Sequence, residues 1–182
     1  MSMIDKIEHA RLLATFVHFG QRRQDGEDYI DHPKRMVFEY LKTIRNELYP
    51  HDDMGETSID NIMRHLNEQQ INVICAIWLH DTIEDAPIEW GMNGFIFQTF
   101  GYDIWDIVII LTHDMKLESY NEYITRVFQH PIAWQIKLVD MIDNTSYEIP
   151  AKQKTKYKDA VIILMMHGVI VPQILKDRLD LN

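Results

Sequence analysis

A histidine and several acids follow an apolar helical stripe in the segment 71–85, INVICAIWLHDTIED. The same helix face, extended by one more turn, carries His80, Asp81 and Glu84 where core side chains are expected. Buried carboxylates are costly unless a cation, a metal ion or a dense hydrogen-bond network compensates them, and a divalent ion is the simplest compensator. The alternative is a helix end that has reached solvent, with ordinary surface acids, because a single His-Asp pair is a weak motif.

A second predicted helix also places polar groups on an apolar stripe. It begins near His130-Pro131 and extends to about residue 147. Within it, Ile136, Asp140 and Asn144 follow one another at intervals of four residues and share a face. Asp143 remains a rival for the inward acid, because apolar residues of the same helix also point toward its position.

A third candidate, His32, stands at the entrance of another predicted helix. Together, His32, His80, Asp81 and Asp140 would form a mixed set of nitrogen and oxygen ligands without sulfur. This set suits Mn²⁺, Fe²⁺ or Zn²⁺ better than Ca²⁺ or Mg²⁺, which prefer oxygen alone. We take Mn²⁺ as the first choice, with Fe²⁺ or Zn²⁺ as alternatives.

Composition limits the kind of protein that carries these residues. A length of 182 residues, 46% hydrophobic and 25% charged, predicts one globular domain over 1–182. A net charge of −10 disfavours nucleic acid as a partner, but it does not exclude a small anionic ligand. The sequence has neither a membrane-length apolar run nor the layout of a signal peptide, and its single cysteine, Cys75, fits a reducing compartment. We therefore expect a cytoplasmic protein with no membrane partner.

The apolar pattern is helical almost throughout, which predicts an all-α bundle. In the first helix we expect Ile7, Leu12, Phe16 and Phe19 to be buried, and in the second Met36, Val37, Tyr40, Leu41 and Ile44. Two other His-Asp groups are interpreted as loops rather than metal sites: residues 51–53 (His51, Asp52 and Asp53) and the pair His113-Asp114. The predicted helices span residues 4–19, 33–46, 58–66, about 71–85, 92–100, 102–111, 120–128, 131–147, 154–166 and 171–179.

Four segments in this order resemble a known family. They are FVHFGQRRQDGEDYIDHP (16–33), LHDTIED (79–85), FGYDIWDIVIILT (100–112) and KLVDMIDN (137–144). The chain resembles the hydrolase half of RelA/SpoT proteins, and it is most similar to the small stand-alone SpoT-like hydrolases of the HD-domain phosphohydrolase superfamily. The likeness covers about residues 4–147, and the C-terminal helices 154–179 lie beyond it.

The resemblance implies an all-helical HD-type fold and a metal-dependent removal of the 3′-pyrophosphate from guanosine tetra- or pentaphosphate (ppGpp or pppGpp), with one Mn²⁺ in the site. By motif, His32, His80, Asp81 and Asp140 would be the metal ligands. Glu84 and Asp85 match the pair that handles the attacking water, and Asn144 matches the asparagine beside the metal and substrate. Arg22 and Arg23 fall where the family keeps basic residues near the nucleotide.

The chemistry of these residue types agrees with those roles. Glu84 and Asp85 each stand four residues after a proposed metal ligand, so each can face the same cavity. A carboxylate that accepts the proton of an attacking water commonly contributes ~10²- to 10⁴-fold. Arg22, Arg23, Lys116 or Lys137 could neutralise phosphate charge. For each arginine a solvated loop is an equal alternative, and for the two lysines a role without substrate contact is favoured.

The chain also departs from the family pattern. Gln24 and Met141 stand where basic residues are common, and the connection 47–70 is long enough to form a lid or an interface, which leaves a homo-oligomer open. These changes put the choice of nucleotide in doubt. Two alternatives therefore stay open: an HD phosphohydrolase acting on a deoxynucleotide, NADPH or another small phosphoester, and a nucleotide-sensing module without catalysis. Because Glu84 and Asp85 are both present, the sensing module is the weaker of the two.

Overall fold

The structure is a computed structural model that describes residues 3–48 and 58–181. Within these residues every regular element is a helix and no strand is formed, so the predicted all-α class is confirmed. The contacts group into two compact units, Met1–Asp106 and Ile107–Asn182. The single domain expected over 1–182 stays a prediction. Residues 51–53, interpreted from the sequence as a loop without metal, lie outside the described part.

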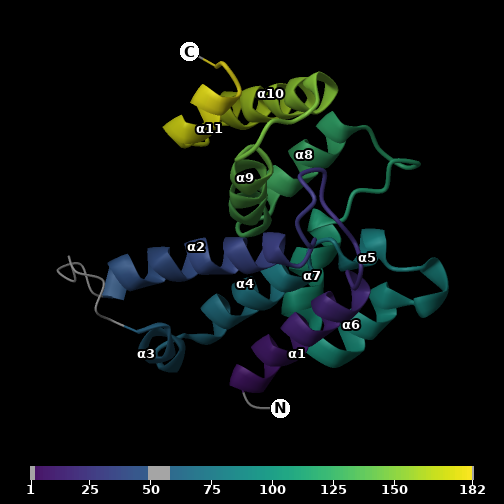
Figure 1. The fold of residues 1–182 in the computed structure, drawn as a ribbon, viewed down its shortest axis with the longest axis vertical. Coiled ribbons are helices and arrows are strands. Elements are labelled where there is room, and N and C mark those ends of the chain that lie inside the picture. The colour runs from purple at the N-terminus through teal and green to yellow at the C-terminus, as the bar shows by residue number, and fades with distance from the viewer. Residues whose placement is uncertain (1–2, 49–57, 182) are drawn as a thin grey trace. The chain divides into compact units, whose positions relative to one another are not determined.

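Unit 1 is built around one buried helix. Its elements are α1 (Met3–Val17), α2 (Asp31–Leu48), α3 (Ile59–Arg64), α4 (Glu68–Leu79), α5 (Thr82–Asp85), the 3₁₀ turn η1 (Ile88–Trp90) and α6 (Met92–Phe100). Both α1 and α2 pack against α4 (Figure 1). Every residue from 71 to 80 is buried, which explains the continuous apolar run in this stretch. A capping box between Asn67 and Gln70 fixes where α4 begins.

The contact face of α1 differs from the predicted one. Leu12, Phe16 and Phe19 are 49%, 64% and 87% exposed, so three of the four predicted buried positions were wrong. The buried stripe consists of Ile7, Ala10, Ala14 and Val17. These residues follow the helical spacing of three and four, and the two alanines let α1 approach α4 closely.

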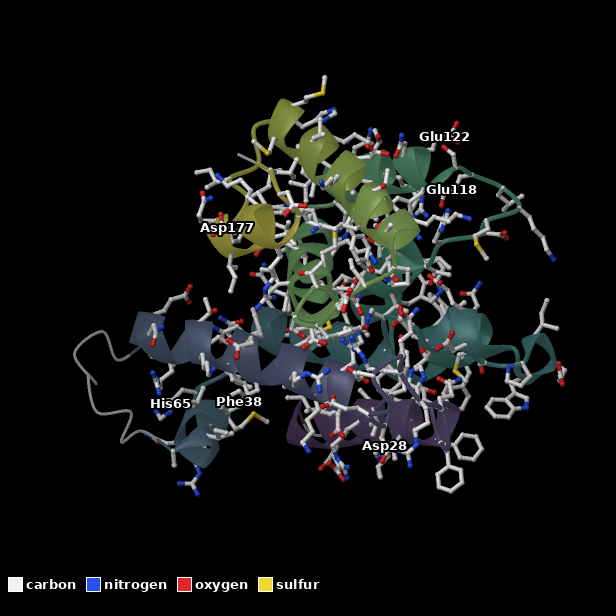
Figure 2. The ribbon with its side chains drawn as sticks, turned by 45° about the horizontal axis from the view of Figure 1, so that its top comes forward. Asp28, Phe38, His65, Glu118, Glu122 and Asp177 are labelled. Atoms are coloured by element: carbon white, nitrogen blue, oxygen red, sulfur yellow. The ribbon has the colours of Figure 1, made fainter. Side chains whose placement is uncertain are left out.

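The inward face of α2 agrees better with the sequence. Pro33 lies in the first turn, where a missing N–H costs nothing. Four of the five predicted inward residues are buried and the fifth, Tyr40, is half-buried. On the outward face Phe38 is exposed, and the Lys42 ammonium lies 4.6 Å from its ring centroid (Figure 2).

The helix α7 (Tyr102–Leu111) spans the boundary between the two units. Both α6 and α7 have the predicted bounds because Gly101 ends α6 with a φ of +85°, a conformation that L side chains rarely adopt.

Unit 2 contains α8 (Tyr120–Gln129), α9 (Ala133–Asn144), α10 (Ala151–Met166) and α11 (Gln173–Arg178). In this unit α8 packs against α9 and α10, and α11 packs against α9. Glu122 forms a capping box with Ser119 at the start of α8 (Figure 2). Glu118, the residue before Ser119, forms an ion pair with Arg126. The largest differences from the predicted bounds are that α9 ends three residues before 147 and that α10 begins at 151 rather than 154. No described helix combines the length and apolar character needed to cross a bilayer.

Candidate metal centre

Three of the predicted ligands come together in unit 1. His32 lies in the first turn of α2, and His80 and Asp81 lie in the short break between α4 and α5. One ligand atom from each of the three lies within 4.8 Å of the others. The two imidazole rings are 5.2 Å apart between centroids, and both histidines are buried. This group therefore has the donor types and the spacing to hold a divalent cation.

The predicted helix 71–85 is broken at this point, which corrects the sequence interpretation. Asp81 has φ −102° and ψ −3°, and the chain restarts as the short helix α5. Two side chains satisfy carbonyl groups in the last turn of α4: Thr82 Oγ1 donates to the Leu79 carbonyl at 2.7 Å, and His80 Nδ1 lies 2.8 Å from the Ile77 carbonyl. The break therefore ends the apolar helix in a satisfied, buried turn.

The contact with Ile77 also sets the orientation of the His80 ring. A carbonyl oxygen only accepts, so Nδ1 carries the proton and Nε2 presents its lone pair in a neutral imidazole. Nε2 lies 3.0 Å from Oδ2 of Asp81, which is itself an acceptor. Two acceptors facing each other at this distance require a cation between or beside them, either a proton or a metal ion. The residues present thus fit a metal ion.

Asp81 is held from a second side by Tyr29. The Tyr29 hydroxyl donates a short hydrogen bond to Asp81 Oδ2. The Tyr29 ring stacks on His18 with centroids 4.5 Å apart, and it meets His32 edge-on at 5.9 Å. Tyr29 therefore contacts two of the three candidate ligands, Asp81 and His32.

A tight loop positions Tyr29 for these contacts. The Tyr29 amide donates to the Gln21 carbonyl at 3.0 Å, and the Arg23 amide donates to the Glu27 carbonyl at 2.9 Å. Gly26 closes the turn with a φ of +88°. The polar loop 21–31 thus folds back on itself. His18 and Tyr29 were not among the predicted site residues, although both belong to the segment 16–33.

The two predicted proton acceptors, Glu84 and Asp85, are both exposed residues of α5. Asp85 Oδ2 lies 3.5 Å from Nδ1 of His18, whose side chain is 1% exposed. His18 Nδ1 also lies 2.8 Å from Oε1 of Gln21. Glu84 is exposed in α5, so its expected place in the core was wrong. Asp85, His18, Tyr29 and Asp81 consequently form one connected series of contacts that reaches the candidate centre.

The two arginines of the loop have opposite exposures. The Arg22 side chain is 63% exposed, pairs with Asp28 at 3.2 Å and donates to the Gly26 carbonyl at 3.0 Å. These contacts agree with the solvated-loop alternative. Arg23 is only 8% exposed, so a solvated loop does not describe it.

In unit 2, Asp140 is the centre of a polar cluster. It is 3% exposed, whereas its rival Asp143 is half-buried. The Lys137 ammonium donates to Oδ2 of Asp140 at 2.6 Å, and the Asn144 amide donates to Oδ1 at 2.6 Å. The helical spacing of three and four residues brings both partners to the carboxylate, as the shared face predicted for Asp140 and Asn144.

The charges in this cluster affect one another. Burial opposes the charged form of Lys137, but the adjacent Asp140 carboxylate together with Tyr123, Tyr120 and Tyr157 outweighs that effect and raises the pKa of Lys137 well above its usual range. Burial, and after it Asp140, raises the pKa of Tyr157 on α10. Lys137 is therefore charged at neutral pH. The expectation that Asp140 is a ligand of the same metal as His32, His80 and Asp81 stays a prediction.

The remaining predicted residues lie in the connection between α7 and α8. His113 and Asp114 follow the last residue of α7; Asp114 Oδ1 accepts the Lys116 amide at 2.9 Å, and the His113 ring stacks on Tyr123 at 4.7 Å. Lys116 itself is exposed. These contacts describe a structured loop.

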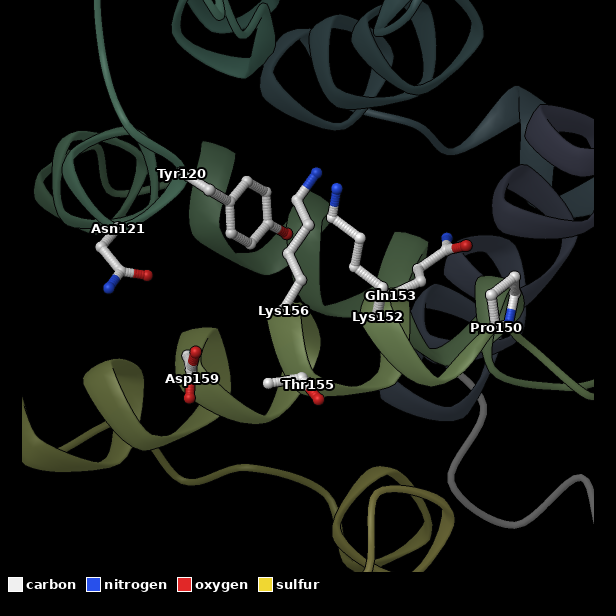
Figure 3. Close-up of a pocket in the computed structure, with 8 residues that line it drawn as sticks. All are labelled: Tyr120, Asn121, Pro150, Lys152, Gln153, Thr155, Lys156 and Asp159. Atoms are coloured by element: carbon white, nitrogen blue, oxygen red, sulfur yellow. The ribbon is translucent and has the colours of Figure 1, made fainter.

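A cavity of about 580 Å³ lies in unit 2 between the start of α8 and the first turns of α10 (Figure 3). Its lining includes Tyr120, Asn121, Lys152, Gln153 and Lys156. None of the predicted substrate-binding residues lines it. Lys152 and Lys156 were not predicted as site residues, and their spacing of four residues is the signal that could have identified a shared face.

No protein-family model and no curated protein matches this sequence. The structure, in contrast, is similar to a solved structure described as a metazoan ortholog of SpoT that hydrolyzes ppGpp and plays a role in starvation responses. The match covers 96% of this chain and 92% of the other, with a TM-score of 0.63 and 21% sequence identity. The chain therefore has the all-helical fold of a SpoT-type hydrolase, as the four segments predicted.

Proposed function

We propose that this protein is a metal-dependent hydrolase that removes the 3′-pyrophosphate from ppGpp. The observation that carries the proposal is the group of His32, His80 and Asp81, whose ligand atoms lie within 4.8 Å of one another. The fold shared with a SpoT ortholog that hydrolyzes ppGpp supports the same reaction class. In this reaction water adds to phosphorus, the bond to the 3′ oxygen breaks, and the products are GDP and pyrophosphate.

In the proposed site His32, His80 and Asp81 hold the metal, and Asp140 supplies the fourth ligand. Mn²⁺ is our first choice for this nitrogen and oxygen donor set, with Fe²⁺ or Zn²⁺ as alternatives. When bound, such an ion makes water more acidic and draws charge from phosphate oxygens. Tyr29 and the Ile77 carbonyl orient Asp81 and His80 for this role, since hydrogen bonds from outside the ligand set fix ligand geometry.

Asp85 is the proposed acceptor of the proton from the attacking water, and Glu84 is proposed to assist it. His18 contacts Asp85 at 3.5 Å and stacks on the Tyr29 ring. Asn144 is proposed to orient Asp140 and the substrate through its amide group. In this proposal the residues of α5 transfer the proton, and Asn144 of α9 positions Asp140 and the substrate.

Phosphate charge is the second requirement of the reaction. Arg23 and Lys137 are the more buried of the four predicted cations, and we propose that they face the substrate. Arg22 and Lys116 are exposed and are proposed to act mainly in attraction of the anion. The proposed partner is thus a small nucleotide in the cytoplasm, without nucleic acid or membrane.

The test is a hydrolysis assay on purified protein loaded with Mn²⁺. We expect equal amounts of GDP and pyrophosphate from ppGpp, and no product after chelation or in His80→Ala and Asp81→Ala. His65→Ala is the matched control, because His65 Nδ1 also contacts a backbone carbonyl, that of Asn61 at 2.8 Å, but its side chain is exposed. Metal-loaded protein that binds ppGpp without turnover over hours would instead support a sensing module.

A different nucleotide is the second candidate substrate. Gln24 is exposed and carries no charge, and Met141 is fully buried, so neither position supplies the cation common in the family. A panel of deoxynucleoside triphosphates and NADPH, assayed beside ppGpp at equal concentration, separates the two. Activity on one of these nucleotides with none on ppGpp would contradict ppGpp as the substrate, but it would remain consistent with a metal-dependent hydrolase.

A further inference from the structure

Exposed apolar side chains gather at the end of α1 and on the η1 turn. Leu12, Phe16 and Phe19 follow one another at intervals of four and three residues, the spacing of one helix face, and all three are exposed. The Phe16 ring stacks on the Trp90 ring with centroids 5.3 Å apart, which joins η1 to this stripe. Ile88, in the same turn as Trp90, is 95% exposed. These five residues, all in unit 1, form the α1–η1 face.

The α1–η1 face is larger than the apolar patches that monomers ordinarily leave in water. The exposed fractions of its side chains correspond to apolar surface on the order of 700 Å², with roughly 200 Å² for each whole side chain. The largest apolar patch of a typical monomer is about 300–600 Å². A stable interface takes about 800 Å² from each partner, and its polar rim supplies part of that area. The face is therefore large enough to be the apolar centre of a dimer interface.

The charges of the protein decide which partner suits this face. The formal net charge of −10 makes two copies repel each other at long range, so they can associate stably only through a contact that is itself uncharged. None of the five residues of the face carries a charge. Glu8, one helical turn before Leu12, pairs with Arg11 at 2.6 Å, so these two charges are matched within α1. A second copy of the chain offers the same uncharged, apolar surface in return.

Unit 2 also exposes apolar side chains, but they form a weaker anchor for a partner. They are aliphatic residues and methionines of α10, of α11 and of the segment between these helices: Ile162, Met165, Met166, Ile170 and Ile174. The residues that contribute most to binding at protein interfaces are enriched in aromatic side chains, and this group has none. In the α1–η1 face the Phe16 and Trp90 rings are already stacked, so less side-chain freedom is lost when a partner binds.

We propose that two copies of this chain associate through their α1–η1 faces and form a homodimer with two-fold symmetry. The same residues of both copies meet in such a dimer, as is usual for homodimers. The stacked Phe16 and Trp90 rings lie at the centre of the contact, and Phe19 and Ile88 become buried in it. The proposal goes beyond the hydrolase function and does not depend on it.

Sedimentation equilibrium of the full chain tests the association. We expect a mass that rises with concentration from 21.7 kDa toward twice that value. Phe19→Ser/Ile88→Ser is expected to raise the dissociation constant of the dimer at least about tenfold, because two large apolar side chains no longer contribute. Met166→Ser/Ile170→Ser is the matched control, since these residues are 80% and 92% exposed in unit 2. The control is expected to change the dissociation constant less than about twofold.

Salt provides a second readout of the same contact. Because salt screens the repulsion between two like-charged copies, the dimer is expected to be tighter in about 0.5 M than in about 0.1 M NaCl. A dimer that salt weakens would depend on ion pairs between the copies and would overturn the proposal.

Two further results would overturn the proposal. One is a control pair that weakens the dimer as much as Phe19→Ser/Ile88→Ser, which would place the interface outside the α1–η1 face. The other is a wild type that stays monomeric up to about 200 µM. Binding of that monomer to phosphatidylcholine vesicles, lost in Phe19→Ser/Ile88→Ser, would then assign the face to a membrane surface. Thermal unfolding of both double variants verifies that they are folded.

Discussion

The hydroxyl of Tyr29 donates a hydrogen bond to Oδ2 of Asp81, 52 residues further along the chain. Asp81 Oδ2 is also the atom that lies 3.0 Å from His80 Nε2. One carboxylate oxygen thus meets a donor from the loop 21–31 and an imidazole from the end of α4. Tyr29 consequently fixes the orientation of the Asp81 carboxylate, and with it the direction from which Asp81 can coordinate a cation.

Removal of this hydroxyl is expected to weaken metal binding. In Tyr29→Phe the ring still stacks on His18, but Asp81 loses its donor, and loss of such a supporting contact typically lowers metal affinity about 10- to 100-fold. Competition with a chromophoric chelator measures the affinity for Mn²⁺. Tyr102→Phe, at an exposed position on α7, is the control. Equal affinities in the two variants would contradict a supporting role for Tyr29.

Asp85→Asn is expected to separate proton transfer from metal binding. If the Asp85 carboxylate accepts the proton of the attacking water, kcat falls by about 10²- to 10⁴-fold while the metal content of the protein is unchanged. Elemental analysis and steady-state kinetics measure the two quantities. Glu89→Gln removes an exposed acid from the neighbouring turn η1 and is expected to leave both unchanged. A loss of metal in Asp85→Asn would instead place Asp85 among the ligands.

Part of this site could be predicted from the sequence. His80 and Asp140 interrupt apolar stripes at helical spacing, and both are buried as that spacing predicts. Asp81 lies in the break after α4, which the spacing did not predict. Tyr29 and His18 could not be predicted in the same way. Their ring contact depends on the hydrogen bonds that fold the loop 21–31 back on itself, and no periodic pattern encodes those bonds.

The fold, too, was predicted from the sequence only in part. Gly101 marks a helix end through its backbone, so α6 and α7 were predicted with correct bounds. In the first predicted helix the aromatic residues Phe16 and Phe19 indicated the wrong face, and Phe19 lies beyond the end of α1. The true contact with α4 uses Ala10 and Ala14, whose small side chains give little hydrophobic signal but permit close approach.

Cys75 provides a test of the core around α4. It is fully buried, and burial raises the pKa of its thiol to about 12, with a smaller opposite effect from Lys6. The thiolate is the reactive form, so the native protein is expected to resist a thiol-specific chromogenic reagent at pH 8 and to react at once after denaturation in urea. Rapid reaction of the native protein would show that α4 opens readily.

Lys137→Met tests the buried pair on α9. The variant removes the Lys137 ammonium and keeps the hydrogen bond from Asn144 to the buried Asp140 carboxylate. Loss of one partner of a buried ion pair costs about 3–5 kcal/mol of unfolding free energy. Lys154→Met is the matched control: its pair with Asp180 is partly exposed and is expected to contribute about 0–1 kcal/mol. Urea unfolding of metal-free protein measures both.

The pH dependence of this difference has a definite sign. The pKa of Lys137 is raised above the ordinary lysine value of 10.5, so below that value the ammonium is charged in both the folded and the unfolded chain. The contribution of the pair is therefore fully present at neutral pH and is lost only as the pH rises through the folded-state pKa. The gap in unfolding free energy between wild type and Lys137→Met should stay constant from pH 7 to about 10. A gap that closes below pH 9 would mean that Lys137 loses its proton early, and the Asp140 carboxylate would then not be its dominant partner.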